Sequence, residues 1–560
     1  MTDALEAVLR GLDGGPYAAY RSLTGRPWEL SAGVVLRVLR VQSDPFAPPS
    51  RCEVRVAADV AGHTPVGLGA AVRRRALAGV LARAAATAGT PFRLDAGGQE
   101  VLRRSSCEVG ADGSVVLRFA YPLPGPRRRV DARTAVRELT RELPRLVADA
   151  LLASAHDPAA LRGCVDAVED ADHLRSVLPG LGLVAFVADG AVLPRRSGVD
   201  DRPAADAVPF SAPAELRVTV DLPHRGPVSG MGLRPGVTVV VGGGFGGKST
   251  LLRALEAGVH DHVPGDGREL VVTVPDAVAL RAEDGRAVTR VDVGAFVGSL
   301  PGGLDPRDFT TPDASGSTSQ AAATMEALEV GTSLLLVDED TAATNLMVRD
   351  ARMQELVAED AEPLTPFVDV VRPLARRGTS TVLVAGASGD FLDVADRVLL
   401  LRDFVCTDVT ARAREVAARP TGRVAEAGDA PVPTDRVVDP GSLDPAVRGR
   451  RTVSARDTGV LRFGEHDVDV RAVRQFTDPA QVTGAGFALD HLIVAGHLDG
   501  RRTLREALDL LEADLAGPLR DWLHGADADV AVPRRHEVAA ALNRLRGLRV
   551  LRLVGRREEG

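Results

Sequence analysis

The sequence is poor in lysine, aromatic residues and cysteine, and each scarcity excludes a class of protein or site. Aromatic residues make up 3% of the chain, which argues against a surface on which nucleic-acid bases stack. The four cysteines, Cys52, Cys107, Cys164 and Cys406, form no C-x-x-C pair, so we expect buried thiols and neither zinc–thiolate sites nor disulfides. Lys248 is the single lysine among 68 basic residues, which indicates a position where a compact ammonium fits and a guanidinium does not.

Long apolar runs are also missing. No segment approaches the roughly 18 apolar residues that can span a bilayer. The start, MTDALEAVLRGLDGG, lacks the basic region and apolar core of a signal peptide. We therefore expect a cytoplasmic protein with no membrane partner. The formal net charge of −8 disfavours a protein coated in nucleic acid throughout, but it allows a local basic groove.

The length of 560 residues is enough for three or four domains. Strand-like runs alternate with helical ones between about 214 and 405, which predicts a parallel α/β core. We expect an α+β domain over 1–205 and this core over 206–417. The Pro-, Gly- and Asp-rich stretch 418–457 predicts a linker or long loop, and 458–560 predicts a mainly helical domain.

A glycine-rich segment carries Lys248. The β-branched run before it predicts a buried strand, and a helix is predicted from Lys248 onward. Between them, GGGFGGKST fits G-x-x-x-x-G-K-[ST], the pattern of a loop that binds phosphates with backbone N–H groups and a helix N-terminus. Lys248 would reach the β- and γ-phosphates of ATP and act in catalysis, and Ser249 would bind Mg²⁺. The predicted nucleotide contacts of this phosphate loop are Gly242, Gly243, Gly244, Phe245, Gly246, Gly247, Lys248, Ser249 and Thr250. A glycine-rich turn with an incidental Lys-Ser is disfavoured, because a strand precedes the segment and a helix follows it.

A second motif is the apolar run SLLLVDED, which predicts a strand ending in carboxylates. Asp338 would hold Mg²⁺ through water, and Glu339 would orient or deprotonate the attacking water. Many strands end in acidic residues, so a solvated strand end is the alternative. The phosphate loop 90 residues upstream of Asp338 favours the catalytic role.

A third motif is DASGSTSQAA at 313–322, which leads into an apolar-periodic helix and by itself predicts only a helix N-cap. Ser315 lies 23 residues before Asp338. In ABC-type ATPases a signature rich in serine and glycine precedes the acidic strand by a similar distance. The order of the three motifs therefore favours that class.

These motifs, with GMGLRPGVTVVVGGGFGGKSTLL, SLLLVDEDTAATNLMVRD and FTDPAQVTGAGFALDHL, resemble the bacterial predicted ATPases of the ABC class. That family is related to a trypanosome mitochondrial ATPase associated with RNA editing, and the resemblance covers nearly the whole chain. It implies a P-loop ABC-type ATPase core with a parallel-rich sheet, flanked by the two other domains. It also implies a homodimer around ATP, with a basic central channel for RNA. The implied contacts with the γ-phosphate of ATP bound to the second protomer are Ser315, Gly316, Ser317 and Gln320.

The sequence departs from ordinary ABC ATPases at positions that bear on turnover. Asn345 stands where an acidic residue is usual, and no histidine follows the run STVLVAG. Ser388 is the candidate for the role of that histidine. A nucleotide-gated RNA-binding scaffold with negligible hydrolysis is therefore the alternative to an ATPase. A transporter subunit is disfavoured, because the 67 residues between Lys248 and Ser315 are too few for the helical subdomain that docks on membrane partners.

Arginine clusters are the candidates for nucleic-acid contacts. They occur at 73–75, at 127–129 and over 534–557, where eight arginines accompany one acidic residue. On the helix predicted near the start of the last cluster, Arg544 and Arg546 lie off the apolar stripe, a position that suits phosphate contacts. A solvated helix face is the alternative, and only the family resemblance favours RNA binding over it.

Overall fold

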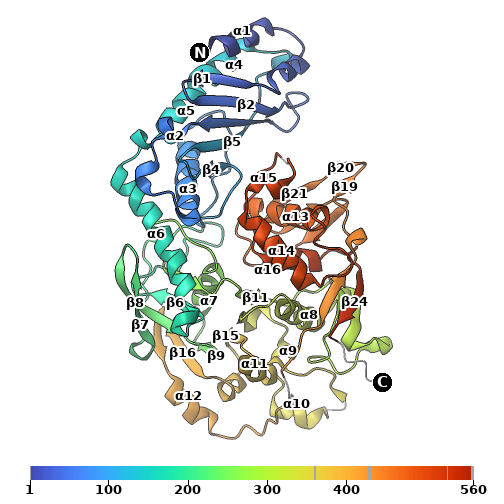
Figure 1. Ribbon diagram of the computed structural model, residues 1–560. Helices are drawn as coiled ribbons and strands as arrows, with labels where there is room; N and C mark the ends of the chain where they lie inside the picture. Colours follow the sequence, from blue (N-terminus) through green and yellow to red (C-terminus); the bar gives the residue numbers. More distant parts are fainter. Residues whose placement is uncertain (1, 359–360, 427–429, 526, 556–560) are drawn as a thin grey trace. The chain divides into compact units, whose positions relative to one another are not determined.

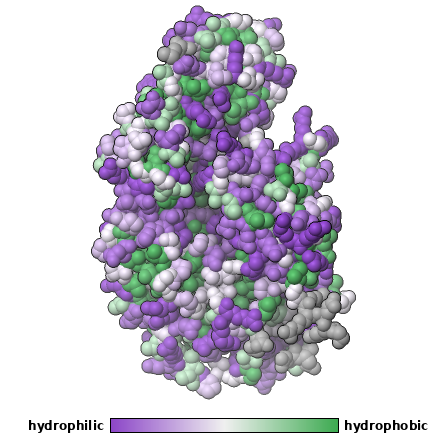
Figure 2. All heavy atoms as spheres, viewed as in Figure 1, coloured by the Kyte–Doolittle hydropathy of each residue, from purple (hydrophilic) through white to green (hydrophobic). Residues whose placement is uncertain are grey.

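The structure is a computed structural model that describes residues 2–358, 361–426, 430–525 and 527–555 (Figure 1). The chain divides into two compact units. The first consists of residues up to Asp172 together with His262–Pro264 and Gly525–Val532, and the second consists of His173–Asp261, Gly265–His524 and the residues from Pro533 onward. No helix among the described residues has the length and apolar character needed to cross a membrane. On the face drawn in Figure 2, hydrophilic residues predominate and apolar ones occur in small groups.

The first unit is built on an antiparallel sheet with strand order β1-β2-β3-β5-β4. Along β2, Val34, Leu36 and Val38 are buried and Arg37 is exposed, as expected for a sheet with one face on a core. That core also contains residues of α1, α3 and α5, which gives the expected α+β arrangement. The elements are α1 (Asp3–Gly11), β1 (Pro27–Ser31), β2 (Val34–Arg40), β3 (Ser50–Val56), α2 (Ala58–Ala61), α3 (Ala71–Thr87), β4 (Cys107–Val109), β5 (Val115–Tyr121), α4 (Ala132–Arg137), α5 (Leu143–Ala150) and α6 (Pro158–Val177).

The first unit ends before the boundary expected near residue 205. β6 (Ala185–Ala188) pairs with β8 (Gly226–Leu233) and β10 (Val271–Thr273), and β7 (Arg217–Leu222) completes the antiparallel sheet β10-β6-β8-β7 of the second unit. The partners of β6 follow it far along the chain. Local composition therefore does not indicate to which unit β6 belongs.

The second unit contains the expected parallel core, a sheet with strand order β11-β14-β15-β9-β16-β17. The strands from β11 to β16 pair in parallel, and β17 pairs antiparallel with β16. Val239, Val337 and Leu383 share a core with α8 and α11, and α7 packs against β14 and β15. The elements are β9 (Val237–Val241), α7 (Lys248–Ala257), β11 (Val278–Leu280), β12 (Arg286–Val291), β13 (Phe309–Ala314), α8 (Gly316–Glu329), β14 (Leu334–Asp338), α9 (Thr344–Met347), α10 (Ala351–Leu356), α11 (Phe367–Arg376), β15 (Ser380–Val384), β16 (Arg397–Arg402), β17 (Val405–Asp408) and α12 (Thr410–Ala417).

The stretch 418–457, expected as a linker or long loop, carries strands. β18 (Asp435–Val438) pairs with β24 (Val550–Val554) near the end of the chain. The helical character expected for the C-terminal region is present, and α13 is buried along almost its whole length and contacts α14, α15 and α16. The other elements are β19 (Ala446–Val447), β20 (Arg450–Arg451), β21 (Val453–Asp457), β22 (Val460–Phe463), β23 (His466–Asp469), α13 (Pro479–Val494), α14 (Leu504–Ala516), α15 (Leu519–Leu523) and α16 (Arg535–Asn543).

Candidate nucleotide-binding site

The phosphate loop lies between β9 and α7, as the sequence predicts. Gly242 and Gly247 have φ angles of +152° and +102°, which residues with side chains rarely adopt. A Cβ on Gly242 would lie 2.2 Å from the carbonyl oxygen of Leu401, and a Cβ on Gly247 would lie 2.9 Å from the ring of Phe404. The Phe404 N–H also donates to the Gly246 oxygen at 3.0 Å. The loop can therefore pack this closely on the β16–β17 hairpin only with glycine at these positions.

Lys248 is the first residue of α7, and its side chain folds over the loop. Its Nζ donates to the carbonyl oxygens of Gly242 at 2.7 Å and Gly243 at 3.1 Å. The ammonium group and the positive end of α7 are thus gathered at one loop, an arrangement that fits the phosphates of a nucleotide. A Cβ built on Gly243 or Gly244 would meet no atom within 4 Å. This part of the loop is therefore open to a ligand.

The remaining loop residues differ in exposure. Phe245 is fully exposed and has a φ of +61°, a strained conformation for an aromatic residue. Its ring therefore contributes nothing to the packing of the loop. Ser249 and Thr250 are half-buried in the first turn of α7. The position of Ser249, directly after Lys248, fits the predicted role of its hydroxyl in binding Mg²⁺.

Asp338 ends β14 at the same edge of the sheet as the phosphate loop. It is aligned with Val384 of β15, and Val384 is aligned with Val240 of β9. Neighbouring strands are spaced about 4.8 Å apart, so Asp338 lies roughly 10 Å from the end of β9. Asp338 Oδ1 accepts a hydrogen bond from the Asp340 N–H at 3.2 Å. This bond restrains the carboxylate at the strand end, and its role in holding Mg²⁺ stays a prediction.

Glu339 is held by the loop that follows β15. Its Oε2 accepts hydrogen bonds from the N–H groups of Gly386 at 2.6 Å and Ala387 at 2.9 Å. Ser388 comes next in this loop, and its hydroxyl donates to Asp390 Oδ2 at 3.3 Å and accepts from the Asp390 N–H at 3.2 Å. Glu339 thus contacts the loop that carries Ser388, but its partners there are backbone N–H groups. The Ser388 side chain bonds to Asp390 and not to Glu339.

The signature segment 313–322 surrounds the start of α8. Ser315 is the N-cap, its Oγ accepts from the Thr318 N–H at 3.4 Å, and it is exposed, with Gly316 half-buried beside it. Ser317 is buried and donates to Asn345 Oδ1 at 2.7 Å. The unusual Asn345 therefore ties the signature to the segment that follows Glu339. Ser315 is exposed at the start of α8, and Asp313 before it is exposed as well.

Gln320 is fully buried. Its Oε1 accepts from the Ala343 N–H at 2.6 Å, and its Nε2 lies 3.2 Å from Met347 Sδ. The side chain therefore positions the segment after Glu339 from within the fold, which differs from the direct nucleotide contact expected for it. Gln320 lies on the buried face of α8, and the sequence pattern alone did not reveal this orientation. Among the described residues, no hydrogen bond or ion pair joins the phosphate loop to the start of α8.

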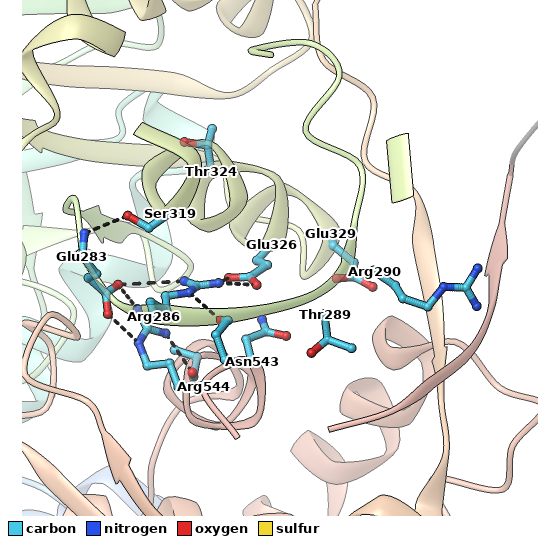
Figure 3. Close-up of polar contacts among 12 residues, drawn as sticks. Glu283, Arg286, Thr289, Arg290, Ser319, Thr324, Glu326, Glu329, Asn543 and Arg544 are labelled. Carbon is cyan, nitrogen blue, oxygen red and sulfur yellow. Dashed lines mark hydrogen bonds and ion pairs between the residues drawn. The ribbon is translucent and has the colours of Figure 1, made fainter. Parts of the chain in front are cut away.

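Two buried ion pairs fix the later turns of α8. Glu326 pairs with Arg286 of β12 (Figure 3), and Glu329 pairs with Arg436 of β18 at 2.6 Å. Arg436 Nη2 also donates to Asn543 Oδ1 of α16 at 2.8 Å. The helix that begins with the signature is thus bonded to strands and helices of the C-terminal region.

A third ion pair joins the C-terminal region to the segment before β12. Arg544 pairs with Glu283, and the Glu283 N–H donates to Ser319 Oγ of α8 at 2.8 Å (Figure 3). Burial alone would raise the pKa of Glu283, but the guanidinium groups of Arg544 and Arg286 hold that pKa below its usual value. The pair of Arg544 with Glu283 could not be predicted from the sequence, because the two residues lie 261 positions apart and share no local pattern.

Most of the arginines proposed for nucleic-acid contacts bind groups of the protein itself. Between residues 534 and 552, the pairs are Arg534 with Glu537, Arg535 with Asp509, Arg544 with Glu283, Arg546 with the carbonyl oxygens of Pro312 and Gly285, Arg549 with Asp439, and Arg552 with the carbonyl oxygen of Arg501. Arg556 and Arg557 lie outside the described residues.

In the first cluster, at 73–75, the arginines also bind groups of the protein. Arg73 pairs with Asp166 at 2.8 Å, Arg74 donates to the carbonyl oxygen of Leu68 at 2.7 Å, and Arg75 pairs with Asp172 at 3.2 Å.

This corrects the expectation that Arg544 and Arg546 present a phosphate-binding face. Tertiary contacts engage their donors, because packing brings acceptors from β13 and from the segment before β12 against the end of α16 and the residues after it. Arg127, Arg128 and Arg129 are exposed. Arg129 Nη1 donates to the carbonyl oxygen of Gly14 at 2.7 Å, so Arg127 and Arg128 are the members of this cluster that remain available to a partner.

Family models match nearly the whole chain. A model described as "P-loop domain" matches residues 157–435. A model described as "ATPase of the ABC class N-terminal" matches 2–154, and one described as "MRB1590 C-terminal domain" matches 452–551. The matched P-loop domain contains the phosphate loop, the acidic strand and the signature.

Similar individual proteins cover less of the chain. An uncharacterised protein of Methanocaldococcus jannaschii is 29% identical over 251 residues. The match covers 41% of this chain and 53% of that protein, so the chain spans about half of its length. The crystal structure of an ABC transporter's ATP-binding cassette in the ADP conformation has 14% identity and a TM-score of 0.21, covering 35% of this chain and 89% of its own. A bacterial Atm1-family ABC exporter with ATP bound has 13% identity and a TM-score of 0.24, covering 43% of each chain.

Proposed function

Because this chain belongs to the ATPases of the ABC class, we propose that it binds and hydrolyses ATP as a Mg²⁺-dependent homodimer in the cytoplasm. The observation that carries the proposal is the separation of two half-sites within one copy. Lys248 and the start of α7 form a phosphate-binding half, whereas Ser315 at the start of α8 is exposed and makes no described bond to that loop. A second copy related by two-fold symmetry would complete both sites at once.

The predicted residues have distinct tasks in this proposal. Lys248 would neutralise phosphate charge, and Ser249 and Asp338 would hold Mg²⁺, which when bound supplies positive charge between the β- and γ-phosphates. Glu339 would orient the attacking water with Oε1, because Oε2 is already held by the loop after β15. Gln320 would act as a positioning residue, since it fixes the segment that follows Glu339.

The main test is steady-state phosphate release by the full-length protein and its Glu339→Gln variant. Loss of a general base typically lowers the rate 10²- to 10⁴-fold, and the variant should retain ATP-dependent dimerisation, measured by light scattering. Asp340→Asn, which changes the exposed neighbouring acid, should leave turnover near that of the unmodified protein. Unchanged turnover in Glu339→Gln would exclude the catalytic role of Glu339.

A Lys248→Ala variant separates nucleotide binding from hydrolysis. Losing one partner of a charge-assisted contact costs about 2–5 kcal/mol, which corresponds to roughly 30- to 4,000-fold weaker ATP binding. Titration with a fluorescent ATP analogue measures this change. A variant that binds the analogue as tightly as the unmodified protein would rule out the phosphate-loop assignment. If ATP produced no dimer of the unmodified protein, the proposed homodimer would be wrong.

The second candidate is a nucleotide-gated RNA-binding scaffold with negligible hydrolysis. It is favoured by the contacts of the Ser388 loop, since Ser388 bonds to Asp390 and Glu339 bonds to backbone N–H groups. Phosphate release that stays at background with ATP and RNA present would support the scaffold. Release stimulated by RNA would support the ATPase.

In either form, we propose that the nucleotide state controls RNA binding and that the exposed Arg127–Arg129 turn contacts RNA phosphates. Each phosphate contact adds about 0.7 to the salt dependence of single-strand binding, so replacing Arg127 and Arg128 with glutamine should reduce the slope by roughly 1.4. Arg145→Gln is the matched control, because Arg145 is an exposed arginine on α5 of the same unit. Equal affinity and slope in both variants would exclude this surface.

A further inference from the structure

Three of the 11 histidines of the chain gather around one aspartate in the C-terminal helices. His491 lies near the end of α13, and Asp514 lies near the end of α14. His497 and His524 follow α13 and α15. The Nε2 atoms of His491 and His497 lie 2.8 Å and 2.6 Å from the same atom, Asp514 Oδ2. The end of α13 and the turn after it thus direct two imidazole nitrogens to one carboxylate oxygen near the end of α14.

The other ring nitrogen of His491 also has a partner. Its Nδ1 lies 2.8 Å from Nε2 of His524. A neutral imidazole carries one N–H, so His491 can donate either to Asp514 or to His524. When it donates to His524, the lone pairs of its Nε2 and of the Asp514 oxygen face each other, and that arrangement is stable only with a proton or a metal ion between them. It is also the arrangement typical of metal-bound histidines, whose second N–H is donated to a neighbouring acceptor.

We propose that His491, His497 and Asp514 bind a divalent transition-metal ion, with Zn²⁺ as the best match, and that His524 orients His491. Two imidazole nitrogens and one carboxylate oxygen suit Zn²⁺, whereas Mg²⁺ and Ca²⁺ prefer ligand sets made of oxygen. The three ligand atoms all lie within 4.8 Å of one another. Ligand atoms around tetrahedral zinc are roughly 3.3 Å apart, given bonds of about 2.0 Å. Binding therefore requires Asp514 Oδ2 to lie about 0.5–0.7 Å farther from the two histidine nitrogens.

The exposure of the cluster fits an accessible metal site. The side chains of His491 and His497 are 7% and 14% exposed, whereas that of Asp514 is 41% exposed. The ion could therefore enter past Asp514, and water could take the fourth ligand position. A bound ion would cross-link the end of α13 to the end of α14. The site uses none of the residues assigned to the nucleotide.

The test is zinc titration of the full-length protein after treatment with a chelator, in the absence of nucleotide so that the proposed Mg²⁺ site is not loaded. Calorimetry and metal analysis after dialysis should give one Zn²⁺ per chain. His497→Gln and Asp514→Asn should each weaken binding at least 100-fold, because each removes one of three ligands. His524→Gln should weaken it 10- to 100-fold and keep the stoichiometry, as expected for a group that orients a ligand.

His466→Gln is the matched control, because it removes an exposed histidine in the same region and should leave binding unchanged. Bound Co²⁺ should show the absorption of a four-coordinate site, and His497→Gln should lose it. Circular dichroism verifies that each variant is folded, and binding is compared among the folded variants, including His524→Gln. The proposal is overturned if the unmodified protein binds no stoichiometric Zn²⁺, if the ligand variants bind as tightly as His466→Gln, or if alkylation of the cysteines abolishes binding.

Discussion

Removing the carboxylate of Glu329 should strongly loosen the junction between α8 and β18. The side chains of Glu329 and Arg436 are 3% and 2% exposed. Glu329 accepts from the Arg436 backbone N–H at 2.9 Å, and from its Nε and Nη2 at 2.9 Å and 2.6 Å. Glu329→Ala would therefore leave a buried guanidinium without its counter-ion and a buried N–H without its acceptor.

Breaking a buried ion pair by removing one partner costs about 3–5 kcal/mol. Because each 1.4 kcal/mol changes an equilibrium constant tenfold, the equilibrium constant for local opening should rise roughly 100- to 4,000-fold. Hydrogen-exchange mass spectrometry of peptides covering α8 and β18 measures this rise, and it does not require two-state unfolding of a chain with several units. The double variant Glu329→Leu, Arg436→Met should recover much of the loss, because both desolvated charges are removed.

Asp467→Asn provides the control for this experiment. Asp467 pairs with Arg462 at the surface, where the side chains are 48% and 38% exposed, and such pairs contribute only about 0–1 kcal/mol. The reasoning is refuted if Glu329→Ala exchanges no faster than Asp467→Asn. It is also refuted if the double variant exchanges as fast as Glu329→Ala, since the loss would then not arise from the uncompensated charge.

Three further predictions concern the loop, the signature and pH. Gly242→Ala should abolish ATP binding in a fluorescence titration, because its Cβ would lie 2.2 Å from a carbonyl oxygen of β16. Gly163→Ala in α6, whose Cβ meets no atom within 4 Å, is the control and should be tolerated. Ser317→Ala leaves the Asn345 amide oxygen without its donor, which should destabilise the local structure by about 1–3 kcal/mol. Hydrogen exchange in α9 should therefore be faster, and unchanged exchange would contradict this prediction. Burial lowers the pKa of His536 well below its usual value, so below about pH 6.5 the unfolded chain binds a proton that the folded chain does not. Stability should therefore fall as the pH drops from 7 to 5, by up to about 1.4 kcal/mol per unit, and His536→Gln should flatten this part of a thermal-unfolding profile; an unaltered slope would contradict the assignment.

Local sequence was sufficient for the chemical parts of the candidate site. A phosphate loop between Val241 and Lys248, a strand ending at Asp338 and a helix capped by Ser315 all occur where the motifs place them. Each depends on glycine conformation, hydrophobic periodicity or side-chain capping within a few residues. Such interactions involve residues that are close together in the sequence, so they can be predicted from a single sequence.

The uses of individual polar side chains were decided by tertiary structure. The sequence offered Gln320 as a nucleotide contact and Arg544 as a phosphate contact, but the fold buries the first against Ala343 and pairs the second with Glu283.

Tertiary structure also decided the pairing of β18, within 418–457, with β24. It likewise brought together the cluster of His491, His497, His524 and Asp514, which are not neighbours in the sequence. The sequence by itself determined which local structures form and which chemical groups they carry. Only the packing of distant segments decided which of those groups meet, because the partner of a charged or polar side chain is chosen by proximity in space and leaves no local pattern.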